Sequence, residues 1–78
     1  MTELEMFAKL PKFDGDYEAS DIGDYLPTLT LADSLNKQYT VCWIEKYTSR
    51  ILDMYFTAST PEEAIRNAYK WCNPNNSL

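Results

Sequence analysis

The chain has 78 residues, of which 45% are hydrophobic and 24% charged, and it carries a net charge of −5 with no histidine. This composition excludes a disordered chain and indicates one small globular domain, residues 1–78, near the lower size limit for a self-supporting core. Without histidine the chain lacks the usual general base and a common zinc ligand, so we expect no metal and no cofactor.

The sequence also bears on the compartment. No apolar run approaches the roughly 20 residues that a membrane helix needs. The first five residues are acidic where a secretory signal would be basic, so we expect a cytoplasmic protein. Cys42 and Cys72 are too few and too far apart for a disulfide framework, and we expect two reduced, buried thiols.

The N-terminal segment begins with a helix signal. Residues 2–5, Thr-Glu-Leu-Glu, have the spacing of a capping box and predict a short helix that continues to Leu10 and ends at Pro11. Residues 14–16 predict a turn around Gly15.

The next stretch is harder to assign. Residues 20–26 predict one or two helical turns before Pro27. Residues 30–35 favour a third short helix capped by Thr30. Leucines and threonines also alternate over residues 28–31, so a strand stays open as the alternative.

Two runs rich in branched and aromatic residues follow, at about 39–45 and 50–58. They predict an antiparallel β-hairpin or small sheet, joined by the short polar segment 46–50. In the second run the side chains of one face should pack under a helix: Leu52, Met54, Phe56 and Ala58. The opposite face is amphipathic and not fully covered in this prediction.

The C-terminal residues predict a helix over about 60–72. Thr60 is expected to cap it, with Pro61 in the first turn and Glu63 closing a capping box. An apolar stripe recurs at helical spacing: Pro61, Ala64, Ile65, Ala68 and Cys72. The predicted fold is therefore α+β, a small antiparallel sheet packed by a C-terminal helix, with short helices in the N-terminal half.

The charge is unevenly spread. Residues 1–35 hold eight acids against two lysines, and residues 36–78 hold four acids against five bases. A nucleic-acid ligand needs a basic cluster, which the sequence lacks, so a basic protein surface is the expected partner, without direct nucleic-acid or membrane binding.

The densest acidic segment supplies the candidate partner-binding residues, together with two neighbouring rings. A solvated segment that only aids solubility is the alternative reading. The spacing from Asp14 fails the calcium-loop pattern, because positions six and twelve are Ala19 and Tyr25. The candidates are Asp14, Asp16, Tyr17, Glu18, Asp21, Asp24 and Tyr25.

Enzymatic chemistry has little support in the sequence. No serine, threonine or cysteine has a histidine to activate it, and two glycines cannot form a phosphate-cradling loop. The six tyrosines and two tryptophans exceed what so small a core buries, and such rings are enriched in contact surfaces. We therefore expect a non-enzymatic, protein-binding chain.

Two resemblances make this expectation more concrete. The predicted hairpin followed by residues 58–68, Ala-Ser-Thr-Pro-Glu-Glu-Ala-Ile-Arg-Asn-Ala, resembles the strand-strand-helix unit of HicB-type antitoxins over about half of the chain. It implies a homodimeric accessory or antitoxin-like domain that pairs through strand edges. Size, acidity and the lack of catalytic motifs are similar to small phage and mobile-element proteins, including anti-CRISPR and other anti-defence inhibitors. That resemblance implies an inhibitor in the host cytoplasm that blocks a basic or nucleic-acid-binding surface of a larger protein, such as a host nuclease complex.

Overall fold

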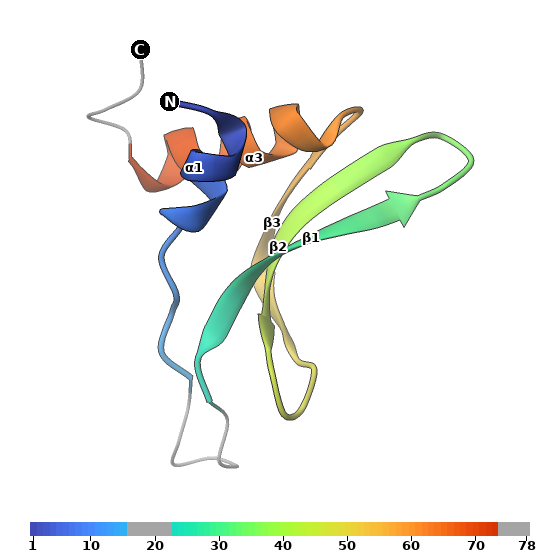
Figure 1. Ribbon diagram of the computed structural model, residues 1–78. Coiled ribbons are helices and arrows are strands. Elements are labelled where there is room, and N and C mark those ends of the chain that lie inside the picture. The colour runs from blue at the N-terminus through green and yellow to red at the C-terminus, as the bar shows by residue number, and fades with distance from the viewer. Residues whose placement is uncertain (16–22, 74–78) are drawn as a thin grey trace.

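The computed structural model describes residues 1–15 and 23–73. Five elements follow in the order α1 (Glu3–Ala8), β1 (Tyr25–Asp33), β2 (Gln38–Glu45), β3 (Ile51–Ala58) and α3 (Pro61–Cys72). The strands form one antiparallel sheet in the order β1-β2-β3, with β2 in the centre (Figure 1). The expected α+β class, with a C-terminal helix on the sheet and a short N-terminal helix, is confirmed.

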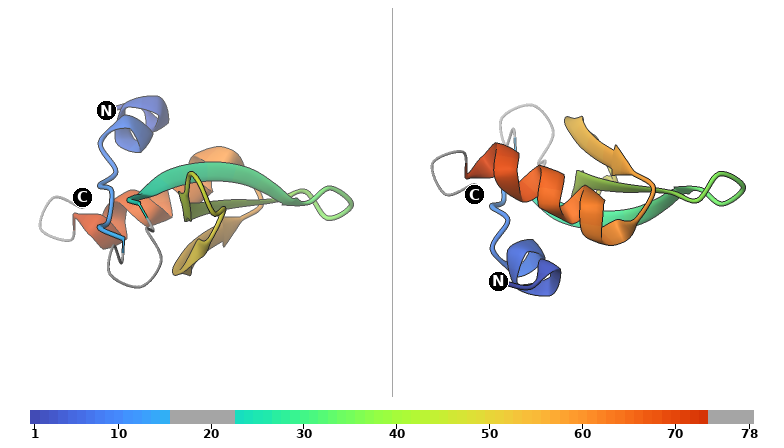
Figure 2. Two further views of the ribbon diagram at one scale, coloured as in Figure 1. Left: turned by 90° about the horizontal axis from the view of Figure 1, so that it is seen from below. Right: turned by 90° about the horizontal axis from the view of Figure 1, so that it is seen from above.

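The molecule is flat. Helix α3 crosses one face of the sheet, and α1 lies beside α3 (Figure 2). The radius of gyration is 13.2 Å and the thinnest dimension is 17 Å, whereas a compact chain of this length has a radius of about 11.5 Å. The hairpin formed by β1 and β2 extends past the start of α3 (Figures 1 and 2). Within residues 1–15 and 23–73, helices thus cover only one face of the sheet.

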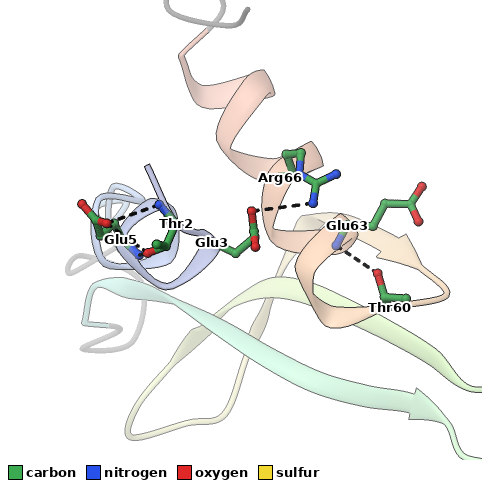
Figure 3. Close-up of polar contacts among 6 residues, drawn as sticks. All are labelled: Thr2, Glu3, Glu5, Thr60, Glu63 and Arg66. Atoms are coloured by element: carbon green, nitrogen blue, oxygen red, sulfur yellow. Dashed lines mark hydrogen bonds and ion pairs between the residues drawn. The ribbon is translucent and has the colours of Figure 1, made fainter.

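Helix α3 forms where its sequence predicts. The Thr60 hydroxyl accepts a hydrogen bond of 3.2 Å from the backbone N–H of Glu63, and Pro61 occupies the first turn (Figure 3). The prediction that Glu63 completes a capping box is wrong, because its carboxylate points away from Thr60 (Figure 3). One hydroxyl cap and two acids near the positive end of the helix dipole suffice to start the helix.

The core lies between α3 and the sheet, as the apolar stripe predicted. Its buried members come from both layers and from the segment after α1: Leu10, Val41, Trp43, Ala64, Ile65 and Ala68. The side chains of β3 that the alternation assigned to this face pack against that cluster: Leu52, Met54, Phe56 and Ala58. Small alanines on α3 let the helix approach the sheet closely, while the large Trp43 fills the centre.

Helix α1 begins at the predicted capping box and ends earlier than predicted. Glu5 N–H donates to the Thr2 hydroxyl, and the Glu5 carboxylate accepts from the Thr2 N–H (Figure 3). The helix stops at Ala8 rather than Leu10, so that Leu10 is buried in the core. An ion pair of 3.6 Å between Glu3 and Arg66 joins α1 to α3 (Figure 3).

Residues 25–33 form a strand, so the favoured short helix over 30–35 is wrong. The predicted helical turns over 20–26 also fail at residues 23–26, while residues 20–22 lie outside the described residues. Pairing with β2 decides the conformation, because alternate residues of β1 pack on opposite faces of the sheet. The turn predicted at residues 14–16 lies partly outside the described residues.

Candidate interaction surface

The sheet face opposite α3 is called the open face here. Nine of its residues form three rows that run straight across the three strands: Leu26, Ile44 and Ile51; Thr28, Cys42 and Tyr55; Thr30, Thr40 and Thr57. None of these nine side chains carries a charge, but the exposed Asp53 of β3 lies on the same face between Ile51 and Tyr55. The rows grade from aliphatic at one end of the sheet to hydroxyl at the other.

The threonine row is ordered by hydrogen bonds. The hydroxyls of Thr40 and Thr57 lie 2.9 Å apart, and the Thr30 hydroxyl donates to the backbone carbonyl of Thr40 at 3.5 Å. These bonds satisfy the hydroxyls within the sheet. The row is therefore a surface of methyl groups as well as hydroxyls.

The aliphatic and mixed rows carry the large exposed side chains of the open face. Leu26, Ile51 and Tyr55 are 42%, 62% and 65% exposed. Cys42 lies between them but is buried, and burial raises the pKa of its thiol. A thiol with a raised pKa is a poor nucleophile, so the face is suited to contact rather than to covalent chemistry.

The acidic segment is fixed to the sheet at both of its ends. Phe13 and Tyr25 exchange two backbone hydrogen bonds, of 3.0 Å and 2.7 Å. The chain between them is residues 14–24, which holds all five candidate acids. Because Tyr25 directly precedes Leu26, the segment starts and ends beside the aliphatic row of the open face.

The described candidate residues differ in their surroundings. Asp14 is exposed. Asp24 is half-buried and forms an ion pair of 3.2 Å with Lys12, so a base that is outside the acidic segment in sequence reaches it in space. Tyr25 is half-buried and packs against the core, which makes it a structural ring more than a projecting one. The other four candidates lie outside the described residues: Asp16, Tyr17, Glu18 and Asp21.

Sequence reasoning missed Glu45, a fully buried carboxylate at the end of β2. Its oxygens accept from the backbone N–H of Tyr47 at 2.9 Å, from the backbone N–H of Thr48 at 2.6 Å and from the Thr48 hydroxyl. These bonds, led by the Thr48 hydroxyl, lower the pKa of Glu45 to about 2, and the backbone of Gly23 adds another. Glu45 therefore joins the turn after β2 to the end of the acidic segment.

There is little free space around the Cα atom of Gly23. A Cβ atom at this position would lie 3.2 Å from a Glu45 carboxylate oxygen and 3.8 Å from the Tyr47 ring. A larger residue here would be in tight contact with the buried carboxylate, which would have to shift by a few tenths of an ångström.

The turn after β1, like the turn after β2, is held by an acid that accepts hydrogen bonds from the residues that follow it. Asp33 accepts from the backbone N–H of Leu35 at 3.0 Å and from the side-chain amide of Asn36 at 2.7 Å, and the Asn36 bonds lead in lowering its pKa. Lys37, four residues after Asp33, has a positive φ angle of 53°. Ser49, four residues after Glu45, likewise has a φ angle of 59°. An acid followed three residues later by a polar side chain is the sequence signal that could have located both turns.

Within residues 1–15 and 23–73, no cluster of three or more acids or thiols is arranged to hold a metal ion. The two cysteines are unpaired, and Cys72 is only half-buried. None of the described helices is long and apolar enough to cross a membrane.

Comparison of the chain with protein-family models, with curated proteins and with solved structures finds no match.

Proposed function

We propose that this chain is a non-enzymatic binding protein that blocks a basic surface of a larger protein. The observation that carries the proposal is that the two ends of the acidic segment are joined, through Phe13 and Tyr25, beside the aliphatic row of the open face. This sheet face exposes Leu26, Ile51 and Tyr55 and also carries Asp53. At its aliphatic end lies the bonded pair of Phe13 and Tyr25, between which the sequence holds five acids.

The two parts have different roles in this proposal. The open face supplies the buried contact area, because large apolar and tyrosine side chains dominate the energy of protein interfaces. The acids supply long-range attraction to a basic partner and speed up the encounter. Lys12 partly neutralises Asp24, so the exposed Asp14 contributes more than Asp24 to this attraction.

The most concrete partner is a protein whose own ligand is a nucleic acid, since such surfaces are basic. A phage-encoded, anti-CRISPR-like inhibitor of a host defence nuclease, acting in the host cytoplasm, has this character. The net charge of −5 supports that version.

The test is quantitative affinity purification from the native host with three tagged forms of the full chain. One form is the parent. A second carries Ile51→Thr and Tyr55→Thr on the open face, which keep residues that favour strands. The matched control carries Leu29→Thr and Leu31→Thr, which alter exposed side chains on the opposite face of the sheet.

We expect one basic protein to co-purify with the parent and the control and to be depleted from the open-face variant. The purified partner should then bind the parent directly, with an affinity that falls as salt rises. Equal recovery by all three forms would overturn the assignment of the open face. Recovery of chaperones alone would overturn the proposed function.

A further inference from the structure

The two edges of the sheet differ in what they offer to another strand. On β1, Tyr25 already gives both of its backbone groups to Phe13. Pro27, two residues later, points to the same side and has no N–H to donate. The β1 edge is therefore occupied at one position and lacks a donor at the next.

The β3 edge is open. In an antiparallel pair, successive residues of a strand point their N–H and C=O groups alternately toward and away from the neighbouring strand. Tyr25 points its groups away from β2, so Thr28, three residues later, points its groups toward Cys42. The N–H and C=O of Cys42 therefore both point toward β1. Tyr55, which faces Cys42 from the other side, must then direct its N–H and C=O out of the sheet. Ile51 and Thr57 stand in the same relation to β2. Strand β3 has no proline, and the described part of the chain places no further strand beside it.

The ends of β3 carry opposite charges. Arg50 directly precedes the strand, and Glu62 and Glu63 follow it in the first turn of α3. All three side chains are exposed. Antiparallel pairing of two copies of this strand would place each Arg50 beside the acids of the other copy, and two-fold symmetry makes that contact twice. Parallel pairing would instead bring like charges together.

We propose that β3 pairs with β3 of a second copy of this chain in antiparallel fashion, giving a continuous six-stranded sheet. A register that sets Tyr55 opposite Asp53 of the second copy keeps the two Asp53 carboxylates apart. Antiparallel edge pairing uses a two-fold axis perpendicular to the sheet, so both open faces lie on the same side. The dimer thus presents a contact surface twice as wide as that of one copy. This inference stands independently of the proposed function.

Sedimentation equilibrium of the full chain over a wide concentration range tests the dimer. Tyr55→Pro removes an outward N–H without removing a bond inside the sheet, and it should abolish dimerisation. Leu29→Pro is the matched control, because Leu29 directs its N–H outward on the β1 edge, and it should leave the dimer unchanged. Circular dichroism checks that each variant is folded.

A charge exchange gives a second test that needs no proline. Arg50→Glu alone, or Glu62→Lys with Glu63→Lys, should weaken dimerisation about two- to thirtyfold, the range for two exposed ion pairs. Combining the three substitutions should restore the affinity. A parent that is monomeric at every concentration would overturn the proposal. A Leu29→Pro variant that dimerises as poorly as Tyr55→Pro would also overturn it. So would a triple variant with a lower dimer affinity than Arg50→Glu alone or the Glu62→Lys, Glu63→Lys pair.

Discussion

The indole N–H of Trp43 donates a hydrogen bond of 2.7 Å to the backbone carbonyl of Pro11, 32 residues earlier in the chain. Trp43 is fully buried at the centre of β2, and its ring lies 5.5 Å from that of Phe13 and 6.1 Å from that of Phe56. A single side chain thus holds the segment after α1 against the middle of the sheet.

Trp43→Phe should destabilise the fold because it removes that donor and leaves the Pro11 carbonyl without its partner. The expected loss is about 1–3 kcal/mol of unfolding free energy, with a further cost for the space that the smaller ring leaves. Urea denaturation measures it. Trp71→Phe is the matched control: Trp71 is 58% exposed, and its replacement should cost less than about 0.5 kcal/mol. Equal losses in the two variants would contradict the role given to the hydrogen bond.

Ile65→Ala should cost roughly 2–5 kcal/mol, the usual range for truncating a buried aliphatic side chain. Ile65 is 7% exposed and belongs to the cluster that joins α3 to the sheet. The exposed Asn67→Ala, on the same helix, should change stability by less than about half a kcal/mol. Thermal and urea unfolding of the pair would show whether α3 is held through this stripe.

Glu45 should make the stability of the protein depend on acid. Its pKa is lowered from 4.5 to about 2 in the folded chain, so the unfolded chain takes up the proton first as the pH falls. The stabilisation is fully present above about pH 4.5 and is lost progressively as the pH falls to about 2. Glu45→Gln should be less stable than the parent at neutral pH, and the difference should shrink across this window.

Thr48→Val is the companion variant, because it removes the hydroxyl that contributes most to the lowered pKa of Glu45. It should raise that pKa toward its ordinary value and narrow the acid-dependent window. Unfolding experiments at a series of pH values follow both variants. A parent and a Glu45→Gln variant with parallel pH profiles would refute this account.

Both cysteines should be reduced. Burial raises the pKa of the Cys42 thiol and of the Cys72 thiol, and the more exposed Cys72 should alkylate faster under native conditions. Mass spectrometry after alkylation in denaturant should find two labelled thiols. A two-hydrogen mass loss with no label would show a disulfide instead.

Neutralising the five acids of segment 14–24 as Asn and Gln should slow association with a basic partner several-fold and leave the fold intact. The difference from the parent should vanish at high salt, which screens such attraction beyond about 8 Å at physiological strength. Surface plasmon resonance at several salt concentrations measures both effects. Equal association rates at low salt would show that the segment serves only solubility.

The hairpin and α3 could be predicted because their local signals agree with their tertiary surroundings. The cap at Thr60, the stripe around Ile65 and the alternation in β3 each match the structure. Strand β1 could not be assigned, because Thr30 is as good a helix cap as it is a strand residue. Its conformation is decided by Thr40, ten residues away, with which it pairs.

The candidate surface was predictable only in part. The alternation of β3 located the part of the open face that β3 contributes, since Ile51, Asp53, Tyr55 and Thr57 fall on the side away from α3. The contribution of β1 required knowing that it is a strand. Tyr25 was expected to project toward a partner, but pairing with Phe13 turns its ring toward the core.

The hydrogen bonds between Phe13 and Tyr25 also bear on how this protein can evolve. They close segment 14–24 at its base, next to the contacts of Gly23 with Glu45 and of Asp24 with Lys12. Doubling the length of such a loop would cost only about 0.6 kcal/mol in closure entropy. Insertions and changes of charge pattern between positions 14 and 23 should therefore cost the fold little. A lineage under pressure to follow a changing partner could vary that stretch while the sheet and α3 stay the same.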